Sequence, residues 1–282
     1  MSERHEPNSV KIEESVKLAL EEDIGIGDIT GELIDPSQTQ SAILLCREES
    51  ILCGSKWFEA SFKIIDPNAN ILWNIEEGAL IEANTEVANI EGNSKCMVAS
   101  ERTGLNFLQM MSGIAYKTYC YNKKLEGSNT TLLDTRKTLP GLSYEQKYSV
   151  VIGGGQNHRM GLYDAALVKE NHIASSGSIK KAVETLRNNE VKIIEVEVEN
   201  LDELREAIDS GADIAMLDNF KQRDIVAAVE IAANKIKLEV SGNIDVYTLS
   251  AIKELDIDYI SSGDLTKNIS ATDYSLKFKS ID

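Results

Sequence analysis

One stretch of the sequence, residues 134–169, gathers side chains that bind anions. It carries five basic residues against three acidic ones, within a chain whose formal net charge is −17. Arginine offers a planar fork that fits a carboxylate, and lysine offers a compact charge that fits phosphate oxygens. The segment predicts a site for a small, multiply charged anion; the alternative is a set of solvated surface cations with partners elsewhere. The basic residues, with the histidines in or just beyond the segment, are Arg136, Lys137, Lys147, His158, Arg159, Lys169 and His172.

A glycine run, Gly153–Gly155, lies just before His158 and Arg159. Glycine has no side chain, so such a loop lets the backbone approach a ligand closely. We expect the loop to present these two residues to the anion. By itself a glycine run marks only a loop, and a single histidine is often a packing residue.

Carboxylates lie at the ends of two successive predicted strands. Glu195, Glu197 and Glu199 alternate with apolar residues, and Asp218 ends the next strand. Carboxylates that face the inside of a parallel sheet are costly unless a cation or a metal pairs with them. Glu197 and Asp218 therefore predict a Mg²⁺ site that bridges phosphates and hydroxyls of a substrate. The alternative is a salt bridge to a lysine or an arginine within the fold.

Two later loops are rich in small residues and follow apolar strands. They are Ser241-Gly242-Asn243 and Ser262-Gly263-Asp264. Backbone N–H groups in such loops form concave sites for a phosphate, although ordinary turns give the same pattern. In barrels the phosphate site often lies in the last two strand-to-helix loops. The pair therefore predicts a phosphate site.

The elements that position these residues repeat regularly from about residue 129. Short apolar or β-branched runs end in polar residues, which recur at intervals of 21 to 35 positions. A strand, a helix and two short loops need about that length, so we expect βα units around a parallel sheet covered on both faces. Open sheets and barrels both place active sites at the carboxyl ends of strands, and the absence of GxGxxG after the first strand favours a barrel. The strand-end residues are Asp134, Lys169, Glu197, Asp218, Ser241 and Ser262.

The first part of the chain has a different pattern. Residues 10–22 have apolar positions at helical spacing and predict an amphipathic helix. Residues 41–91 predict short strands separated by turns, with one helix near 56–65. Residues 97–121 contain no proline and have a long apolar face, so we expect a helix that joins the two regions.

Composition excludes several classes of protein. With 42% hydrophobic and 27% charged residues the chain is typical of globular proteins rather than disordered ones. The net charge of −17 repels nucleic acid and anionic lipid, so we expect neither as a partner. The first ten residues lack the apolar core of a signal peptide, and the four cysteines form no CxxC pair. We therefore expect a cytoplasmic protein with reduced thiols.

The sequence resembles the quinolinate phosphoribosyltransferase family, also called carboxylating nicotinate-nucleotide pyrophosphorylases. The similarity covers nearly the whole chain, and its longest motifs are specific. The segments that carry it are EEDIGIGDIT (21–30), ERTGLNFLQMMSGIAY (101–116), DTRKTLPGL (134–142), KYSVVIGGGQNHRMGLYDAALVKENHI (147–173), VEVEN (196–200), LDNF (217–220), SGNI (241–244) and SSGDLT (261–266).

The resemblance implies an enzyme of NAD biosynthesis. Such a transferase moves a phosphoribosyl group from 5-phosphoribosyl-1-diphosphate (PRPP) to quinolinate, with Mg²⁺, and yields nicotinate mononucleotide, pyrophosphate and CO₂. The implied α/β fold is an N-terminal α/β sandwich over residues 1–106, to which residues 267–282 return. An incomplete, seven-unit-like α/β barrel over residues 107–266 would carry the site. The implied functional unit is a homodimer or a higher oligomer, in which Arg102 reaches the neighbouring chain's site.

The resemblance also assigns roles to residues. Lys137, Glu197 and Asp218 are the implied catalytic residues, and the last two would also hold the metal. The implied substrate-binding residues are Arg102, Thr135, Arg136, Lys137, His158, Arg159, Lys169, Glu197, Asp218, Ser241, Gly242, Asn243, Ser262, Gly263 and Asp264.

The chain departs from the family pattern beside the second small-residue loop. Family members usually carry alanine where this chain has Asp264, and His-Ser where it has Lys267-Asn268. A carboxylate there would repel a phosphate unless it points away or pairs with Lys267. The alternative functions are those of a molybdenum-transport-associated paralogue with another acceptor, a Schiff-base aldolase that uses Lys169, and a non-enzymatic sugar-phosphate sensor.

Overall fold

The computed structural model describes residues 6–242, 244, 249–250 and 252–279. The chain forms two compact units. The first comprises Met1–Lys117, Pro140–Gly153 and Ile269–Asp282, and the second comprises Thr118–Leu139 and Gly154–Asn268. Residues 107–117 and 140–153, which the sequence analysis placed with the barrel, therefore belong to the first unit.

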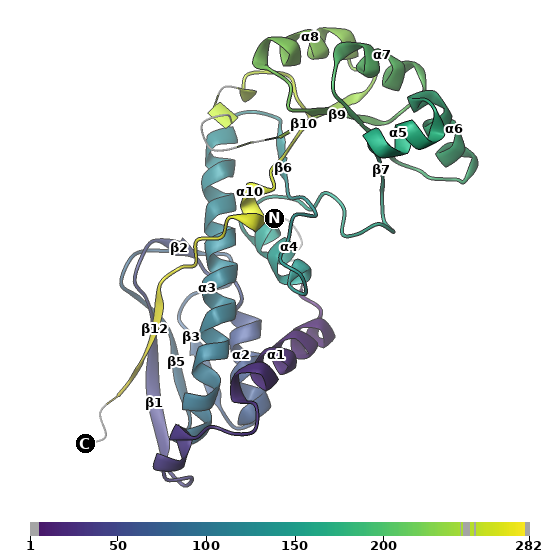
Figure 1. The fold of residues 1–282 in the computed structure, drawn as a ribbon. Helices are drawn as coiled ribbons and strands as arrows, with labels where there is room; N and C mark the ends of the chain where they lie inside the picture. Colours follow the sequence, from purple (N-terminus) through teal and green to yellow (C-terminus); the bar gives the residue numbers. More distant parts are fainter. Residues whose placement is uncertain (1–5, 243, 245–248, 251, 280–282) are drawn as a thin grey trace. The chain divides into compact units, whose positions relative to one another are not determined.

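The first unit is built on an antiparallel sheet in the order β12-β1-β5-β3 (Figure 1). Strand β12, from the last part of the chain, pairs with β1. A C-terminal segment therefore completes the sheet of the N-terminal unit. The strands are β1 (Thr39–Cys46), β3 (Asn70–Trp73), β5 (Thr85–Asn93) and β12 (Tyr274–Phe278), with a separate pair β2 (Ser50–Ile51) and β4 (Leu80–Ile81).

Helices of the first unit cover the sheet because their apolar faces need a partner. Helix α2 buries Phe58 and Phe62, whose ring centroids lie 4.7 Å apart, and Phe58 meets Trp73 of β3 edge-on at 5.7 Å. These rings join the buried core of β1 and β5. The helices are α1 (Ser9–Ile24), α2 (Ser55–Ile65), α3 (Ser94–Leu125) and α4 (Ser143–Ile152), with a 3₁₀ turn η1 (Thr30–Leu33).

The second unit is built on a parallel sheet of six strands in the order β6-β11-β10-β9-β8-β7. Its inner strands are buried almost throughout, and helices lie along their outer side (Figure 1). The strands are β6 (Thr131–Leu133), β7 (Ala166–Val168), β8 (Ile194–Val198), β9 (Ile214–Asp218), β10 (Lys237–Ser241) and β11 (Tyr259–Ser261). The helices are α5 (Glu170–Ser176), α6 (Ile179–Asn188), α7 (Leu201–Asp209), α8 (Gln222–Ala232) and α10 (Asp264–Lys267).

The sheet curves as an incomplete barrel whose edge strands are β6 and β7. Between them in sequence, Gln156 forms a single parallel bridge with Leu133 of β6. The backbone N–H of Gln156 donates to Leu132 (2.9 Å), and its carbonyl accepts from Asp134 (3.1 Å). A one-residue bridge thus occupies the place of a seventh strand, which agrees with the predicted incomplete barrel.

Most of the elements predicted from the sequence are present. The opening helix, the helix near 56–65 and the long helix over 97–121 are confirmed as α1, α2 and α3. In α1 the Asn8 side chain accepts from the N–H groups of Val10 (3.0 Å) and Lys11 (3.3 Å), which fixes its first turn. Within the described ranges, no helix is both long enough and apolar enough to cross a bilayer.

Candidate active site

The carboxyl ends of the parallel strands share one cavity of about 400 Å³. Each polar residue predicted at a strand end lies within one residue of the end of its strand, so residues far apart in the chain meet at one edge of the sheet. The predicted site residues that line this cavity are Thr135, Arg136, Lys137, His158, Arg159, Lys169, Glu197, Asp218, Ser241 and Gly242.

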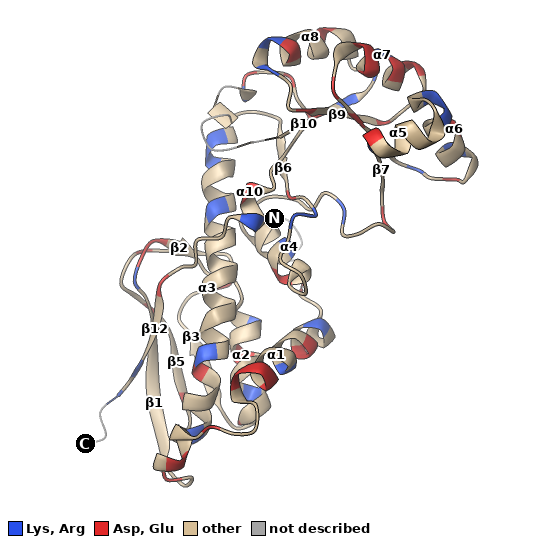
Figure 2. Cartoon of the chain, in the orientation of Figure 1, with Lys and Arg blue, Asp and Glu red and all other residues tan. Residues whose placement is uncertain are grey.

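The cavity is positively charged although the chain is acidic. Its walls hold five basic side chains but only two carboxylates, Glu197 and Asp218. Many acidic residues lie instead on outer surfaces, as on helix α7 with Asp202 and Asp209 (Figure 2). A small polyanion is therefore attracted to the strand ends and repelled by the outer helices.

Asp134 fixes the loop that carries the His-Arg pair. It is fully buried at the end of β6. Its Oδ1 accepts from the backbone N–H of His158 (3.0 Å), and its Oδ2 accepts from the side-chain amide of Asn157 (2.5 Å). The loop after the glycine run is thus tied to β6, which places His158 and Arg159 in the cavity wall as predicted.

His158 lies against two buried carboxylates inside the barrel. Its Nε2 is 2.8 Å from Oε2 of Glu195 and 3.4 Å from Oε2 of Glu239. Burial by itself lowers the pKa of His158, but the two carboxylates outweigh it and raise that pKa to about 10. Burial raises the pKa of Glu195 to about 7, against the hydrogen bond from His158. The imidazole is therefore a cation at neutral pH.

Arg159 supplies a second inward cation, only 8% exposed. Burial lowers the pKa of its guanidinium, and the charge of neighbouring Arg136 lowers it further. Two guanidinium groups that repel each other across a cavity gain most from an anion placed between them. Their arrangement favours a ligand with more than one carboxylate.

Lys169 and Glu197 form an ion pair in the cavity wall. The ammonium of Lys169, at the end of β7, donates to Oε2 of Glu197 on β8. This ion pair is the salt bridge predicted from the sequence as the alternative to a metal site at Glu197. Asp218 has a different environment: it accepts from the side chain of Asn219 (2.8 Å) and has no cationic partner among the described residues.

The donor set of the cavity fits Mg²⁺ at Asp218. Its carboxylate lines the cavity without a cation, and hard oxygen ligands are those that Mg²⁺ prefers. Glu197 can contribute to such a site the carboxylate oxygen that does not contact Lys169. One or two carboxylates plus substrate oxygens are a common Mg²⁺ arrangement.

A second cavity of about 260 Å³ is formed by the two small-residue loops. Gly242 has φ +96°, and a Cβ there would stand 2.9 Å from the backbone nitrogen of Asn219. A Cβ on Gly263 would stand 2.7 Å from Cδ of Lys137, whose stem passes over this loop. At Gly242 the positive φ and the nearby backbone favour glycine, whereas a side chain at Gly263 would displace the Lys137 stem. The lining residues are Lys137, Ser241, Gly242, Ile244, Ser261, Ser262, Gly263, Asp264, Lys267 and Asn268.

The Asp264 carboxylate is held by neutral groups beside this second cavity. Its Oδ2 accepts from the phenol of Tyr121 (2.6 Å), and its Oδ1 accepts from the side-chain amide of Asn268 (2.6 Å). No described contact pairs it with Lys267, whose exposed ammonium has no ion-pair partner in the described part of the chain. The Asp264 carboxylate is thus held by hydrogen bonds from Tyr121 and Asn268.

Several residues named from the sequence lie outside the two cavities. Arg102 is exposed on α3 in the first unit. Asn243 lies outside the described residues. Lys147 is buried in α4 of the first unit, so it does not belong to the cationic cluster of the barrel. His172 lines neither cavity, and its Nδ1 accepts a hydrogen bond from the backbone N–H of Lys169 (3.0 Å).

The structure also adds residues that sequence reasoning missed. Glu239 on β10 contacts His158, and Asn219 contacts both Asp218 and the Gly242 position. Glu239 stands two residues before Ser241, so its alternation with apolar neighbours was the available signal. Asn219 follows Asp218 directly and has φ 55°, a conformation that asparagine tolerates.

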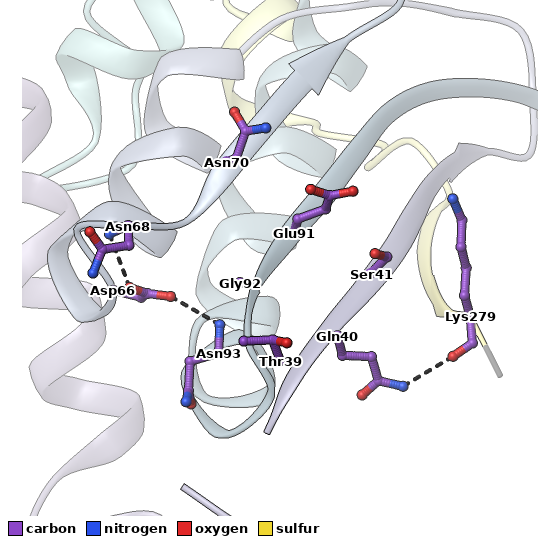
Figure 3. Close-up of a pocket in the computed structure, with 10 residues that line it drawn as sticks. All are labelled: Thr39, Gln40, Ser41, Asp66, Asn68, Asn70, Glu91, Gly92, Asn93 and Lys279. Carbon is purple, nitrogen blue, oxygen red and sulfur yellow. Dashed lines mark hydrogen bonds between the residues drawn. The ribbon is translucent and has the colours of Figure 1, made fainter. Parts of the chain in front are cut away.

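A larger cavity, of about 770 Å³, lies on the first unit's sheet. Asp66 accepts there from the backbone N–H groups of Asn68 (3.0 Å) and Asn93 (3.0 Å), as Figure 3 shows. Gln40 donates to the carbonyl of Lys279 (3.1 Å). These contacts stabilise a turn and the ends of strands, and the side chains do not converge as those of the barrel do.

Comparisons with known proteins cover nearly the whole chain. Residues 114–277 match the quinolinate phosphoribosyl transferase C-terminal domain, and residues 28–112 match its N-terminal domain. The chain is 37% identical over 257 residues to a probable carboxylating nicotinate-nucleotide pyrophosphorylase of Bacillus subtilis, covering 90% of this chain and 89% of that protein. It is 36% identical over 289 residues to a decarboxylating quinolinate phosphoribosyltransferase of Nicotiana tabacum, covering 94% and 82%.

Solved structures extend the similarity to three dimensions. The nicotinate-nucleotide pyrophosphorylase of Francisella tularensis superimposes with a TM-score of 0.94 at 44% identity, over 99% of this chain and 100% of that one. The C-terminal domain match, residues 114–277, spans the strand ends that form the two cavities. The chain therefore belongs to the quinolinate phosphoribosyltransferase family.

Proposed function

We propose that this chain transfers the phosphoribosyl group of PRPP to the ring nitrogen of quinolinate, a step of NAD biosynthesis. The products are nicotinate mononucleotide, pyrophosphate and CO₂. The observation that carries the proposal is the pair of cavities: a strongly cationic one beside one built from small-residue loops. A dicarboxylate acceptor and a phosphorylated sugar need that combination.

In this proposal the acceptor binds among the cations of the larger cavity. Arg136, His158 and Arg159 contact the two carboxylates, and Lys169 adds a further charge. The 5-phosphate binds the loops at Ser241–Gly242 and Ser262–Gly263. Lys137 lines both cavities, so its ammonium is placed to contact the departing pyrophosphate.

The reaction then needs orientation and charge more than covalent catalysis. The bond from the sugar's anomeric carbon to pyrophosphate breaks with the electron pair leaving on the pyrophosphate. The electron pair of the ring nitrogen forms the new bond. Positive charge develops on the ribose, and Glu197 and Asp218 are placed to stabilise it or to bind the ribose hydroxyls.

Decarboxylation follows because the alkylated ring nitrogen is cationic. The carbon–carbon bond to the adjacent carboxylate breaks, CO₂ leaves, and a proton takes its place on the ring carbon. Asp218, with Glu197 beside it, would hold Mg²⁺, which neutralises phosphate charge when bound.

The proposed functional unit is a homodimer or a higher oligomer, in which Arg102 of one chain completes the neighbouring site. An exposed arginine on a helix of the first unit agrees with a role toward another chain. The cytoplasmic location predicted from the sequence belongs to the same proposal.

The test is the formation of nicotinate mononucleotide from quinolinate, PRPP and Mg²⁺, with nicotinate as the control acceptor. Product with quinolinate supports the proposal, and binding of PRPP without turnover would favour a sensor. A Schiff-base aldolase is less compatible with the structure, because the Lys169 side chain is engaged in an ion pair with Glu197. Borohydride trapping with a carbonyl substrate tests that alternative.

A further inference from the structure

We propose that Glu195 and Glu239 are positioning residues, which fix His158 by its Nε2 and so present Nδ1 as a hydrogen-bond donor to a substrate carboxylate. This inference rests on the proposed function, because it concerns the acceptor cavity. Neither carboxylate lines that cavity, and His158 is the residue that links them to it.

The geometry leaves one ring nitrogen for a ligand. Nε2 of His158 faces both carboxylates, at 2.8 Å from Glu195 and 3.4 Å from Glu239. The backbone N–H of His158 is fixed by Asp134 as well, so both the ring and the main chain of this residue are held. With Nε2 occupied, Nδ1 is the ring nitrogen that remains to contact an anion.

Burying two carboxylates beside one imidazole lowers the stability of the fold, so a functional role would explain their presence. Glu239 is 1% exposed and Glu195 is 4% exposed. Among the described residues, one oxygen of Glu195 contacts His158 at hydrogen-bond distance, whereas Glu239 has only its 3.4 Å ion-pair contact with that ring. A fold that needed only packing would gain from apolar residues at these positions. Their charge is explained if it keeps the imidazole protonated and oriented.

Other charged groups around the ring are consistent with this role. Arg159 is attracted by Glu195 but repelled by Arg136, so the acidic pair also offsets part of the cavity's positive charge. Two carboxylates and a histidine are also a possible ligand set for a divalent cation, and the three donor atoms lie within 4.8 Å of one another. The short contact between His158 and Glu195 favours the hydrogen-bonded arrangement, and the experiment separates the two.

The experiment is a double-substitution cycle with His158→Asn and Glu239→Gln. The KM for quinolinate, the KM for PRPP, kcat and the melting temperature are measured for the four proteins. We expect Glu239→Gln to raise the KM for quinolinate about tenfold, because the ring loses one of the two charges that keep it protonated and oriented, with the KM for PRPP unchanged. In the His158→Asn background the same change should alter that KM less than about twofold.

Further variants keep the inference falsifiable. Glu195→Gln should raise the KM for quinolinate as Glu239→Gln does. It replaces Glu239→Gln in the cycle if that variant does not fold. Glu199→Gln is the matched control, because Glu199 follows the same strand but is exposed. It should change neither KM.

Three results would overturn the inference. The first is an equal effect of Glu239→Gln with and without His158. The second is a change in melting temperature alone. The third is a stoichiometric divalent metal, found by elemental analysis of the wild-type protein and lost in Glu239→Gln. An active wild type with one of these results refutes the positioning role only, whereas a wild type that binds no quinolinate refutes the proposed function too.

Discussion

The phenol of Tyr121 donates a 2.6 Å hydrogen bond to Oδ2 of Asp264, beside the loop proposed to bind phosphate. Tyr121 lies on α3 and is 5% exposed, so the bond is shielded from water. Asn268 holds the other carboxylate oxygen. The chain thus has a negative side chain at a position where it would repel a phosphate, and Tyr121 and Asn268 help to restrain it.

Removing that restraint should weaken the use of PRPP. In Tyr121→Phe the Asp264 carboxylate loses its buried donor, and we expect the KM for PRPP to rise about three- to tenfold, the order of one hydrogen bond to a charged group. The KM for quinolinate should not change. Steady-state kinetics with each substrate varied in turn measure both values.

The control for this prediction is a second substitution at Asp264. Adding Asp264→Ala to Tyr121→Phe removes the repelling charge and should restore the KM for PRPP. Tyr259→Phe, which removes only a surface contact with Lys237, should have no effect. A double variant no better than Tyr121→Phe would show that the tyrosine supports the loop for another reason.

The choice of acceptor follows from the number of cations. A dicarboxylate can contact more of the cations Arg136, Arg159 and Lys169 than one carboxylate can. Arg159 is the buried one of the three, and a buried cation left without a partner is costly. We therefore expect kcat/KM for nicotinate to be at least about a hundredfold below that for quinolinate. Arg159→Leu should reduce the ratio of the two kcat/KM values. Comparable values for the two acceptors in the wild type would contradict this explanation.

The ion pair between Lys169 and Glu197 gives a prediction about the sugar substrate. Glu197→Gln keeps the size of the side chain but removes its charge, and we expect kcat/KM for PRPP to fall about tenfold or more. The Lys169 side chain is 43% exposed, so the loss of the pair should change stability little. Unchanged PRPP kinetics with a much lower melting temperature would assign the pair a structural role only.

The buried histidine predicts how stability depends on pH. The pKa of His158 is raised to about 10 in the folded chain, above the ordinary value of 6.5. Its protonation therefore stabilises the fold fully below about pH 6.5, and that contribution decreases as the pH rises toward 10. Chemical unfolding at pH 6 to 10 should show the free energy of unfolding of the wild type falling as the pH rises. A free energy of unfolding that stays constant over this range would exclude a strongly bound proton.

Sequence alone predicted the strand-end residues well and their pairing poorly. Asp134, Lys169 and Asp218 end apolar runs, and the geometry of parallel strands then brings such ends together. Periodicity could not show that Glu195 and Glu239 meet at His158, because that contact depends on which strands lie across the barrel from one another. It also could not divide the two units, since Pro140–Gly153 returns to the first unit by tertiary packing.

The shared-site proposal can be tested by complementation. Arg102→Ala and Lys137→Ala should each be nearly inactive, because each removes a cation from every composite site. Unfolded, mixed and refolded, they should regain activity, since a mixed dimer has one site with both residues intact. Random pairing makes about half of the dimers mixed, so roughly a quarter of all sites should be restored. Demonstrated chain exchange without recovered activity would place Arg102 in its own chain's site.

The central claim is that one site couples phosphoribosyl transfer to loss of one carboxylate. The most direct measurement uses quinolinate labelled in the carboxylate adjacent to the ring nitrogen, with PRPP and Mg²⁺, and follows the three products together. We predict nicotinate mononucleotide, pyrophosphate and labelled CO₂ in equal amounts, with none formed when PRPP is omitted. Pyrophosphate release without CO₂, or CO₂ release without PRPP, would contradict the account.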